Sequence, residues 1–132
     1  MMRNDHFDES TVEQAAKEWL AEIGFHTGYA PVDAAVEDVR DSLGDCILWS
    51  HVANALTRLN PGVDPDLVRS AVARIQRAES QDGMSENQRL YELMVRGVPV
   101  ETTGDDGRPS TVRLQLVDFD TPGNNDWRAL NQ

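Results

Sequence analysis

Carboxylates are the side chains of this sequence whose type and spacing could support chemistry. Glu9 and Glu13 lie one helical turn apart, and Asp118 and Asp120 flank a single residue just before a turn. Carboxylates that converge on one point can hold Mg²⁺ and assist hydrolysis. The simpler interpretation is structural, because acids in a first helical turn cap the helix and an Asp beside a turn accepts hydrogen bonds from nearby amides. Glu9 and Glu13 therefore stand as possible metal-site helpers only.

Other reactive side chains have no partner at a useful spacing. His6, His26 and His51 are scattered, and Cys46 is the only cysteine, so the sequence has neither zinc-ligand spacing nor an internal disulfide. We expect Cys46 to be a small core residue. Lys17 is the only lysine, and neither a Glu-x-Lys pair nor a glycine-rich phosphate loop ending in Gly-Lys-Ser/Thr occurs. The sequence predicts no catalytic residue, metal ligand or cofactor site of its own.

The totals limit the class of protein. A chain of 132 residues is the size of one domain, and 39% hydrophobic with 27% charged residues is typical of a globular protein. The net charge of -11 argues against a stand-alone nucleic-acid binder, because phosphate contacts need clustered basic residues. The sequence shows no apolar run long enough for a membrane span and no secretory signal, so we expect a cytoplasmic protein.

Helical periodicity dominates the first part of the chain. A capping box of Ser10 and Glu13 predicts the start of a first helix, and Gly24 predicts its end. Most of 25–44 is expected to be loop. The apolar face of this helix comprises Val12, Ala15, Ala16, Trp19, Leu20 and Ile23. We expect Trp19 and Trp49 in the core and Trp127 to be partly exposed.

Three more helices are predicted before any strand. The second runs from about Cys46 to Leu59 and ends at Asn60-Pro61-Gly62; Asp64-Pro65 opens the third; and a capping box at 85–88 opens the fourth, which Gly97 closes. The expected buried face of the third helix comprises Leu67, Val68, Ala71, Val72 and Ile75.

After Gly97 the periodicity changes to that of strands. Residues 98–103 and a second run from Val112 to near Phe119 predict an antiparallel hairpin around the turn at 104–107. A dense turn follows at 120–125, and Trp127–Gln132 begins another extended segment. A lone hairpin is marginally stable, so a larger sheet is expected. The predicted fold is α+β in one domain, 1–132, with a helical lobe at 9–97 and the hairpin and start of a sheet at 98–132.

Three stretches of the sequence are similar to the N-terminal region of type I restriction enzyme R subunits. The first is Glu9–Glu13 followed by Trp19-Leu20 and Ile23–Phe25, and the second is Ala55–Pro61. The third follows the family pattern in order over the last part of the chain: Asn87, Arg89, Leu93, Gly97–Glu101, Val117, Asp118, Phe119, Asp120, Pro122, Asn124, Asn125, Asp126, Asn131 and Gln132. Residues 27–45 depart from the pattern. Asn60 and Pro61 belong to the resemblance as a helix end, so these positions are expected to be structural.

The resemblance implies the N-terminal part of a restriction-endonuclease-like, PD-(D/E)xK nuclease domain. In that family the metal-binding Asp and the Glu-x-Lys follow on strands after an Asn-Gln pair such as Asn131-Gln132. The full-length family member uses ATP to translocate double-stranded DNA, cleaves it with Mg²⁺ as a type I site-specific deoxyribonuclease, and docks on methylation and specificity subunits. This chain alone is then expected to be inactive, with a scaffolding role beside the rest of the R subunit.

Two other interpretations remain open. An acidic chain can act as a stand-alone interaction protein of the DNA-mimic or anti-restriction type, although mimicry requires carboxylates spaced along one surface and the acids here fall on polar helix faces and turns. A small metal hydrolase built on Glu9, Glu13 and Asp118 is the third. Coding sequence beyond Gln132 that holds a Glu-x-Lys and a phosphate loop would favour the R subunit.

Overall fold

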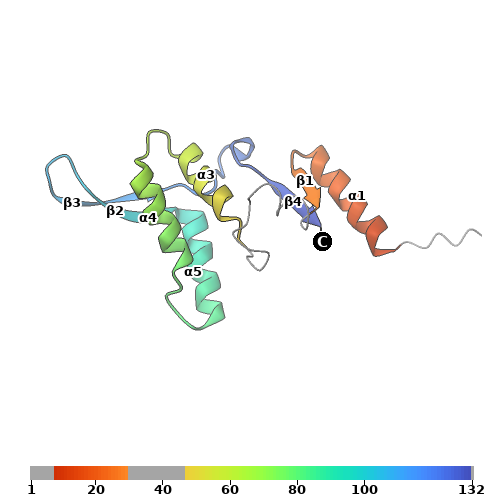
Figure 1. Ribbon diagram of the computed structural model, residues 1–132, viewed down its shortest axis with the longest axis horizontal. Coiled ribbons are helices and arrows are strands. Elements are labelled where there is room, and N and C mark those ends of the chain that lie inside the picture. Colours follow the sequence, from red (N-terminus) through yellow and green to blue (C-terminus); the bar gives the residue numbers. More distant parts are fainter. Residues whose placement is uncertain (1–7, 30–46, 132) are drawn as a thin grey trace, which may run out of the picture. The chain divides into compact units, whose positions relative to one another are not determined.

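The computed structural model describes residues 8–29 and 47–131, and within them it is a mixed α+β structure with four α-helices (Figure 1). The chain divides into two compact units, one made of 1–44 with 126–132 and the other of 45–125. The α+β class is as predicted. The sequence predicted one helical lobe at 9–97. In the structure the first helix belongs to the unit formed by 1–44 and 126–132, and the other described helices belong to the second unit. In the described ranges no helix combines the length and apolar character needed to cross a membrane.

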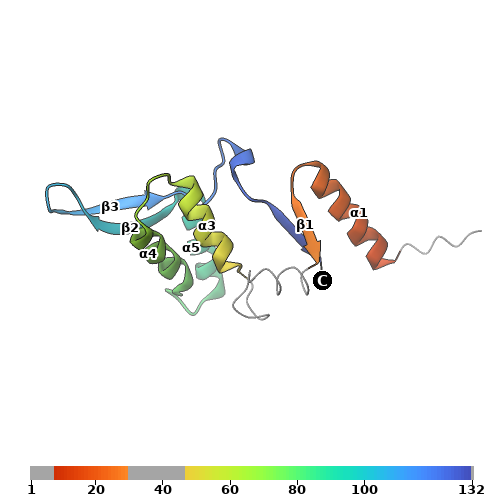
Figure 2. The ribbon, with the colours of Figure 1, turned by 45° about the horizontal axis from the view of Figure 1, so that its top comes forward.

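The first unit combines α1 (Glu9–Glu22) with two short strands, β1 (His26–Tyr29) and β4 (Arg128–Asn131). The strands pair in parallel, from His26 opposite Arg128 to Tyr29 opposite Asn131 (Figure 2). The expectation of a loop at 26–29 is therefore wrong. Four residues reading His-Thr-Gly-Tyr lack an apolar alternation, and their partner lies about a hundred positions later. Residues 30–44 of the expected loop, together with His6, Cys46 and Gln132, lie outside the described residues.

The first helix begins at a different cap from the one predicted. Asp8 is the N-cap, and its Oδ1 accepts hydrogen bonds from the Thr11 amide at 2.9 Å and from the Ser10 and Thr11 hydroxyls at 2.8 Å each. Ser10 therefore donates to the cap instead of being the cap. These hydrogen bonds hold the pKa of Asp8 below its ordinary value. The bond from the Ser10 hydroxyl has the largest effect, followed by the bond from the Thr11 amide.

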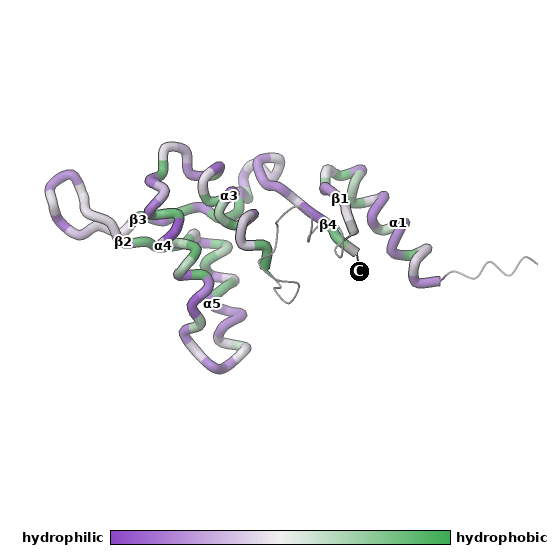
Figure 3. The backbone as a smooth tube through the Cα atoms, in the orientation of Figure 1, coloured by the Kyte–Doolittle hydropathy of each residue, from purple (hydrophilic) through white to green (hydrophobic). Residues whose placement is uncertain are grey.

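Much of the apolar surface of α1 faces outward. Hydrophobic and hydrophilic residues alternate along this helix (Figure 3), and Trp19 is 69% exposed, so its expected place in the core is wrong. The apolar positions span more of the helix circumference than two short strands can cover, and Leu20 is among the residues that are half-buried. Trp127 is 38% exposed, as expected, and its ring lies 5.8 Å from that of Phe25.

The second unit consists of three helices and a hairpin. Its elements are α3 (Trp49–Leu59), α4 (Pro65–Gln76), α5 (Gly83–Arg96), β2 (Val98–Thr103), β3 (Pro109–Leu114) and a 3-10 turn, η1 (Pro122–Asn124). The strands are antiparallel, with Val98 opposite Leu114. The second strand was expected to run from Val112 to near Phe119, whereas β3 begins at Pro109 and ends at Leu114. It ends there because the backbone of Gln115 binds the side chain of Asn60, the C-cap of α3.

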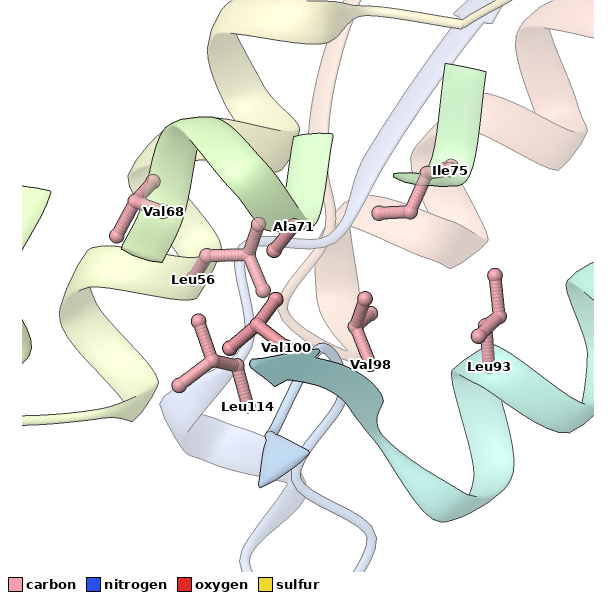
Figure 4. Packing of buried hydrophobic residues seen from close by; sticks show 8 residues of the cluster. All are labelled: Leu56, Val68, Ala71, Ile75, Leu93, Val98, Val100 and Leu114. Carbon is pink, nitrogen blue, oxygen red and sulfur yellow. The ribbon is translucent and has the colours of Figure 1, made fainter. Parts of the chain in front are cut away.

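One apolar cluster joins all five of these helices and strands. Its side chains point toward one another from both strands and three helices (Figure 4). The buried members are Leu56, Val68, Ala71, Ile75, Leu93, Val98, Val100 and Leu114. Trp49 packs half-buried against them, as expected for a core tryptophan. Val98 and Val100 on β2 are buried, whereas Pro99 and Glu101 are more exposed, as expected for a strand with one face toward the core.

The third helix starts as predicted, with Asp64 as N-cap and Pro65 in the first turn. The fourth does not, because α5 begins at Gly83 and its N-cap is Asp82, whose carboxylate accepts from the Met84 amide and the Ser85 hydroxyl. The predicted cap at Ser85 is therefore wrong by three residues. The Ser85 hydroxyl bond is also the main cause of the lowered pKa of Asp82.

Gly97 connects α5 to β2 in a conformation that only glycine adopts readily. Its φ of 87° and ψ of 163° place it outside the regions open to other residues, and its amide donates to the Leu93 carbonyl. A Cβ at this position would lie 3.0 Å from the Leu114 carbonyl oxygen. Backbone conformation and a close approach to β3 both require the glycine.

We predict that Gly97→Ala lowers the free energy of unfolding by roughly 1–3 kcal/mol, the range for a residue held in a sparsely populated backbone region. Urea unfolding followed by circular dichroism measures it. Gly83→Ala is the matched control, because Gly83 is helical, has an ordinary φ, and an added Cβ there would meet no atom within 4 Å. Equal stability of the two variants would show that Gly97 carries no strain requirement.

Candidate functional site

The turn after β3 is held by its own side chains. Asp118 Oδ1 accepts from the amides of Asp120 at 3.1 Å and Thr121 at 2.9 Å, while Oδ2 accepts from Asn124 Nδ2 at 2.9 Å. These bonds, led by the one from the Thr121 amide, lower the pKa of Asp118 below its ordinary value. The carboxylate therefore stays ionised and fastens the turn. Asp120 is exposed at its edge.

Asn125 closes the same turn from its other end. Its Oδ1 accepts from the Asp118 amide at 2.8 Å, and its Nδ2 donates to the carbonyls of Asp118 at 2.7 Å and Pro122 at 3.1 Å. Because the Asn125 amide group both donates and accepts, it satisfies the backbone amide and the carbonyl of Asp118, as a neighbouring strand would. Phe119 is left 57% exposed between the two fastening residues.

Asn60 joins the end of α3 to the residue that follows β3. Its Nδ2 donates to the Leu56 carbonyl at 2.7 Å and to the Gln115 carbonyl at 2.9 Å, and its Oδ1 accepts from the Gln115 amide at 2.8 Å. One side chain thus satisfies both backbone groups of Gln115 and one carbonyl at the helix end. The following Pro61 is exposed. The sequence predicts the helix end at this place, whereas the contact spanning 55 positions has no local signal.

A partly buried ion pair near the start of α5 holds the end of α4. Arg89 contacts Glu86 Oε2 through Nε at 3.1 Å and Nη2 at 2.9 Å, with the two side chains only 13% and 18% exposed. The same guanidinium donates to the carbonyls of Arg74 and Ile75. Its hydrogen bond to Glu86 is the largest cause of the lowered pKa of that carboxyl.

Glu86 also binds the loop that precedes its helix. Its Oε1 accepts from the amides of Glu79 and Ser80 at 2.8 Å each, so the pair connects both ends of the loop between α4 and α5. Sequence reasoning identified Arg89 through the resemblance but not the role of Glu86, although their three-residue spacing is a typical ion-pair signal. Asn87, also part of the resemblance, lies exposed on α5.

The acidic residues proposed as metal-site helpers lie in the first unit. Glu9 is exposed in the first turn of α1, and Glu13 is half-buried one turn further on. Within residues 8–29 and 47–131, no three His, Cys, Asp or Glu side chains form a group suited to a metal ion. Glu9 and Glu13 belong to the first unit and Asp118 to the second, and the helper role of Glu9 and Glu13 stays a prediction.

The two described histidines occupy unlike surroundings. His26 Nε2 on β1 lies 4.0 Å from Asp126 Oδ1, and the other oxygen of Asp126 contacts Arg128 Nε at 3.3 Å. His51 is half-buried in α3. Asn131 ends β4, the strand that precedes Gln132 in the sequence. The Asp126 contacts connect neighbouring parts of the parallel strand pair and so are consistent with a structural role.

A groove of about 470 Å³ in the second unit lies beside α4 and β2. Arg74 and Arg77 line it together with Glu79 and Glu101, and the Arg74 and Glu79 side chains are 4.0 Å apart. Opposite charges in equal number give the groove no clear preference for an anion or a cation. It therefore offers no concentrated field of the kind that attracts phosphate groups.

Most of the side-chain hydrogen bonds made by Asn60, Arg89, Asp118 and Asn125 bind backbone groups. The chain belongs to the family described as the type I restriction enzyme R protein N terminus, whose model matches residues 6–132. Asn60, Asp118 and Asn125, which the resemblance marked, make the hydrogen bonds described above, and the role of the motif positions in the family stays a prediction.

Two relatives are similar over 95% of this chain. The "Type I restriction enzyme HindI endonuclease subunit" of Haemophilus influenzae is 30% identical over 128 residues, and the "Putative type I restriction enzyme MjaIXP endonuclease subunit" of Methanocaldococcus jannaschii is 23% identical over 125. The chain spans 12% of the length of each relative. No solved structure matches the chain.

We predict that Asn60→Ala lowers the free energy of unfolding by roughly 1–3 kcal/mol, because it leaves the amide and carbonyl of Gln115 without their side-chain partner. Asn87→Ala, on an exposed face of α5, is the matched control and should change it little. Urea unfolding of both variants measures the difference. A loss no greater for Asn60→Ala than for Asn87→Ala would contradict the assigned role.

The turn at Asp118 predicts a pH dependence. The folded-state pKa lies below the ordinary value of 3.8, so the unfolded chain binds more protons in acid and the stabilisation is lost as pH falls through the folded pKa. Wild type should therefore exceed Asp118→Asn in stability at neutral pH, and the gap should shrink below pH 3.8. Asp105→Asn, in the hairpin turn, controls for net charge. A gap that stays constant with pH would show that the charge of Asp118 is irrelevant.

Proposed function

We propose that this chain is the N-terminal, structural portion of the nuclease domain of a type I restriction enzyme R subunit. Its work is to position a catalytic sheet that the rest of the subunit supplies, and the domain has the restriction-endonuclease-like fold. By itself the chain neither cleaves nor translocates DNA. Family membership supports the assignment to the subunit, and the parallel strand pair supports the role of a platform.

The parallel pair of β1 and β4 is the observation that carries the proposal. Parallel strands are normally buried on both faces within larger sheets, and two short strands alone are marginal. In the described part of the chain this sheet has two strands, and neither α1 nor residues 26–28 and 128–130 of the strands include a fully buried residue. Further strands beside β1 or β4 would supply the missing hydrogen bonds and cover.

Phosphodiester hydrolysis in such a domain requires a divalent cation, held by carboxylates and assisted by a lysine. The described residues offer no group of metal ligands, and the only lysine lies in α1 without a Glu-x-Lys spacing. The residues that the structure describes therefore do not fit Mg²⁺, and no phosphate loop for ATP occurs in the sequence. Both cofactors would be held by the rest of the R subunit.

The proposal also defines the partners. The rest of the R subunit is the direct partner of this region, and the complete subunit docks in the cytoplasm on methylation and specificity subunits. Double-stranded DNA is reached only through that assembly. The net charge of -11 fits this division of labour, because an acidic scaffold would not compete with the DNA-binding surface for the phosphate backbone.

The same charge favours one alternative, an acidic interaction protein that imitates DNA and occupies the basic groove of a nuclease. The carboxylates with assigned roles argue against it, because Asp8, Asp82, Glu86 and Asp118 are engaged in caps, a loop and a turn. A mimic would need its acids spread outward at phosphate-like spacing.

We expect no Mg²⁺-dependent plasmid cleavage by the purified 132-residue chain, whereas the product of the complete gene, combined with its partner subunits, should cleave with Mg²⁺ and ATP. Cleavage by the short chain that disappears in the double variant Glu9→Gln/Glu13→Gln would overturn the scaffold role and assign these carboxylates to a metal site. Inhibition of a type I enzyme by the short chain, relieved by added DNA, would favour the mimic instead.

A further inference from the structure

An apolar stripe runs along the outward face of α1. Val12, Ala16, Trp19 and Ile23 follow at spacings of four, three and four, which place them within about 60° of one another around a helix. All four are exposed, at 61% for Val12, 69% for Trp19 and 73% for Ile23. A continuous apolar stripe that includes an exposed tryptophan is typical of a surface that binds another protein surface.

Carboxylates border this stripe on both sides. At the helical angle per residue, Glu9 and Glu13 fall along one edge, and Glu18 and Glu22 fall along the other. Lys17, the only basic residue of the helix, lies one turn after Glu13 on the first of these sides, about as far from the stripe as Glu18 lies on the other, so the border keeps a net negative charge. Glu9, Glu18 and Glu22 are exposed, and Glu18 accepts a hydrogen bond from Gln14. The face therefore combines an apolar centre with a negative rim.

We propose that this face of α1 docks into an apolar groove rimmed by arginine or lysine, located in the remaining polypeptide of the same R subunit. The inference rests on the proposed function, because it needs the longer chain. Two observations identify the occupant. The rim is acidic on both edges, so a favourable partner is basic, and this region spans only 12% of its relatives, so most of the polypeptide that could cover the stripe lies outside it.

A second copy of the same helix is a poor occupant. Two such faces would bring their glutamate rows together along both edges, and like charges placed across an interface disfavour association. The stripe of one copy could still meet an unrelated surface of another copy, so self-association remains an outcome that the experiment must detect.

The test replaces Trp19 with the photo-crosslinking residue p-benzoylphenylalanine in the product of the complete gene. Irradiation should give a cross-link within one polypeptide to an apolar residue beyond 132 that has Arg or Lys neighbours. The exposed side chain of Trp19 makes the replacement compatible with folding. The same crosslinker at Glu101, exposed on β2, is the matched control and should give no cross-link to that site.

Charge reversal tests the rim. Glu18→Lys/Glu22→Lys should lower the cross-link yield by about threefold or more, since each exposed ion pair contributes little and two are reversed. Glu101→Lys should leave the yield unchanged. Hydrogen exchange of α1 in the unmodified complete protein gives an independent readout and should be slower than in the 132-residue chain.

Several results would overturn the inference. Cross-links to a second copy, to another subunit, or to residues within 1–132, and equally a lack of cross-links with unchanged exchange of α1, would each exclude the proposed occupant. Failure of the proposed function is distinguishable, because then the complete gene product would lack ATP- and Mg²⁺-dependent DNA cleavage. A cleaving protein in which position 19 stays uncovered would refute the docking surface alone.

Discussion

Backbone groups at the ends of helices and strands need hydrogen-bond partners, and the arrangement of residues 45–125 depends on how that need is met. The apolar cluster attracts the hairpin to three helices, but hydrophobic attraction has no direction. Side-chain amides and one ion pair add directional contacts. Asn60 binds both backbone groups of Gln115, and Arg89 binds two carbonyls at the end of α4.

An apolar side chain could not replace these contacts, because each one is a hydrogen bond to a backbone amide or carbonyl. Asn125 both donates and accepts within one turn, which a carboxylate or an alkyl side chain cannot do. The Glu86–Arg89 pair is nearly covered, yet its remaining hydrogen-bonding groups reach amides and carbonyls of the neighbouring loop and helix. A buried ion pair is favourable when its desolvation is offset in this way. These contacts hold the path of the backbone between the helices and strands.

The sequence predicted the helices well because their signals are local. Apolar spacing and Asp64-Pro65 placed α4, and Gly97 placed the end of α5. The errors share a physical cause, which is competition between neighbouring residues or distant partners. Asp8 and Asp82 are each followed within three residues by a serine that begins a capping-box pattern. The pattern therefore predicts each helix start two or three residues too late. Strand β1 has no pattern of its own, because a parallel partner far along the chain creates it.

Roles at the candidate site were harder to predict than positions. The resemblance marked Asn60, Arg89, Asp118 and Asn125, and nothing in their local spacing indicated which backbone groups each would bind. Contacts across 55 or 15 positions follow only from the packed fold. Asp118 was the exception, since an Asp directly before a turn predicts bonds to the next amides, and its hydrogen bonds have that form.

The two units differ in what stabilises them, and the difference bears on function. Residues 45–125 enclose eight buried apolar side chains, so their fold is supported from within. In the described part of the other unit, a helix contacts two parallel strands, no residue of the helix is fully buried, and Trp19 is 69% exposed. A unit with few apolar contacts of its own depends for its stability on surfaces that pack on it. This dependence is the property that a platform for further strands would need.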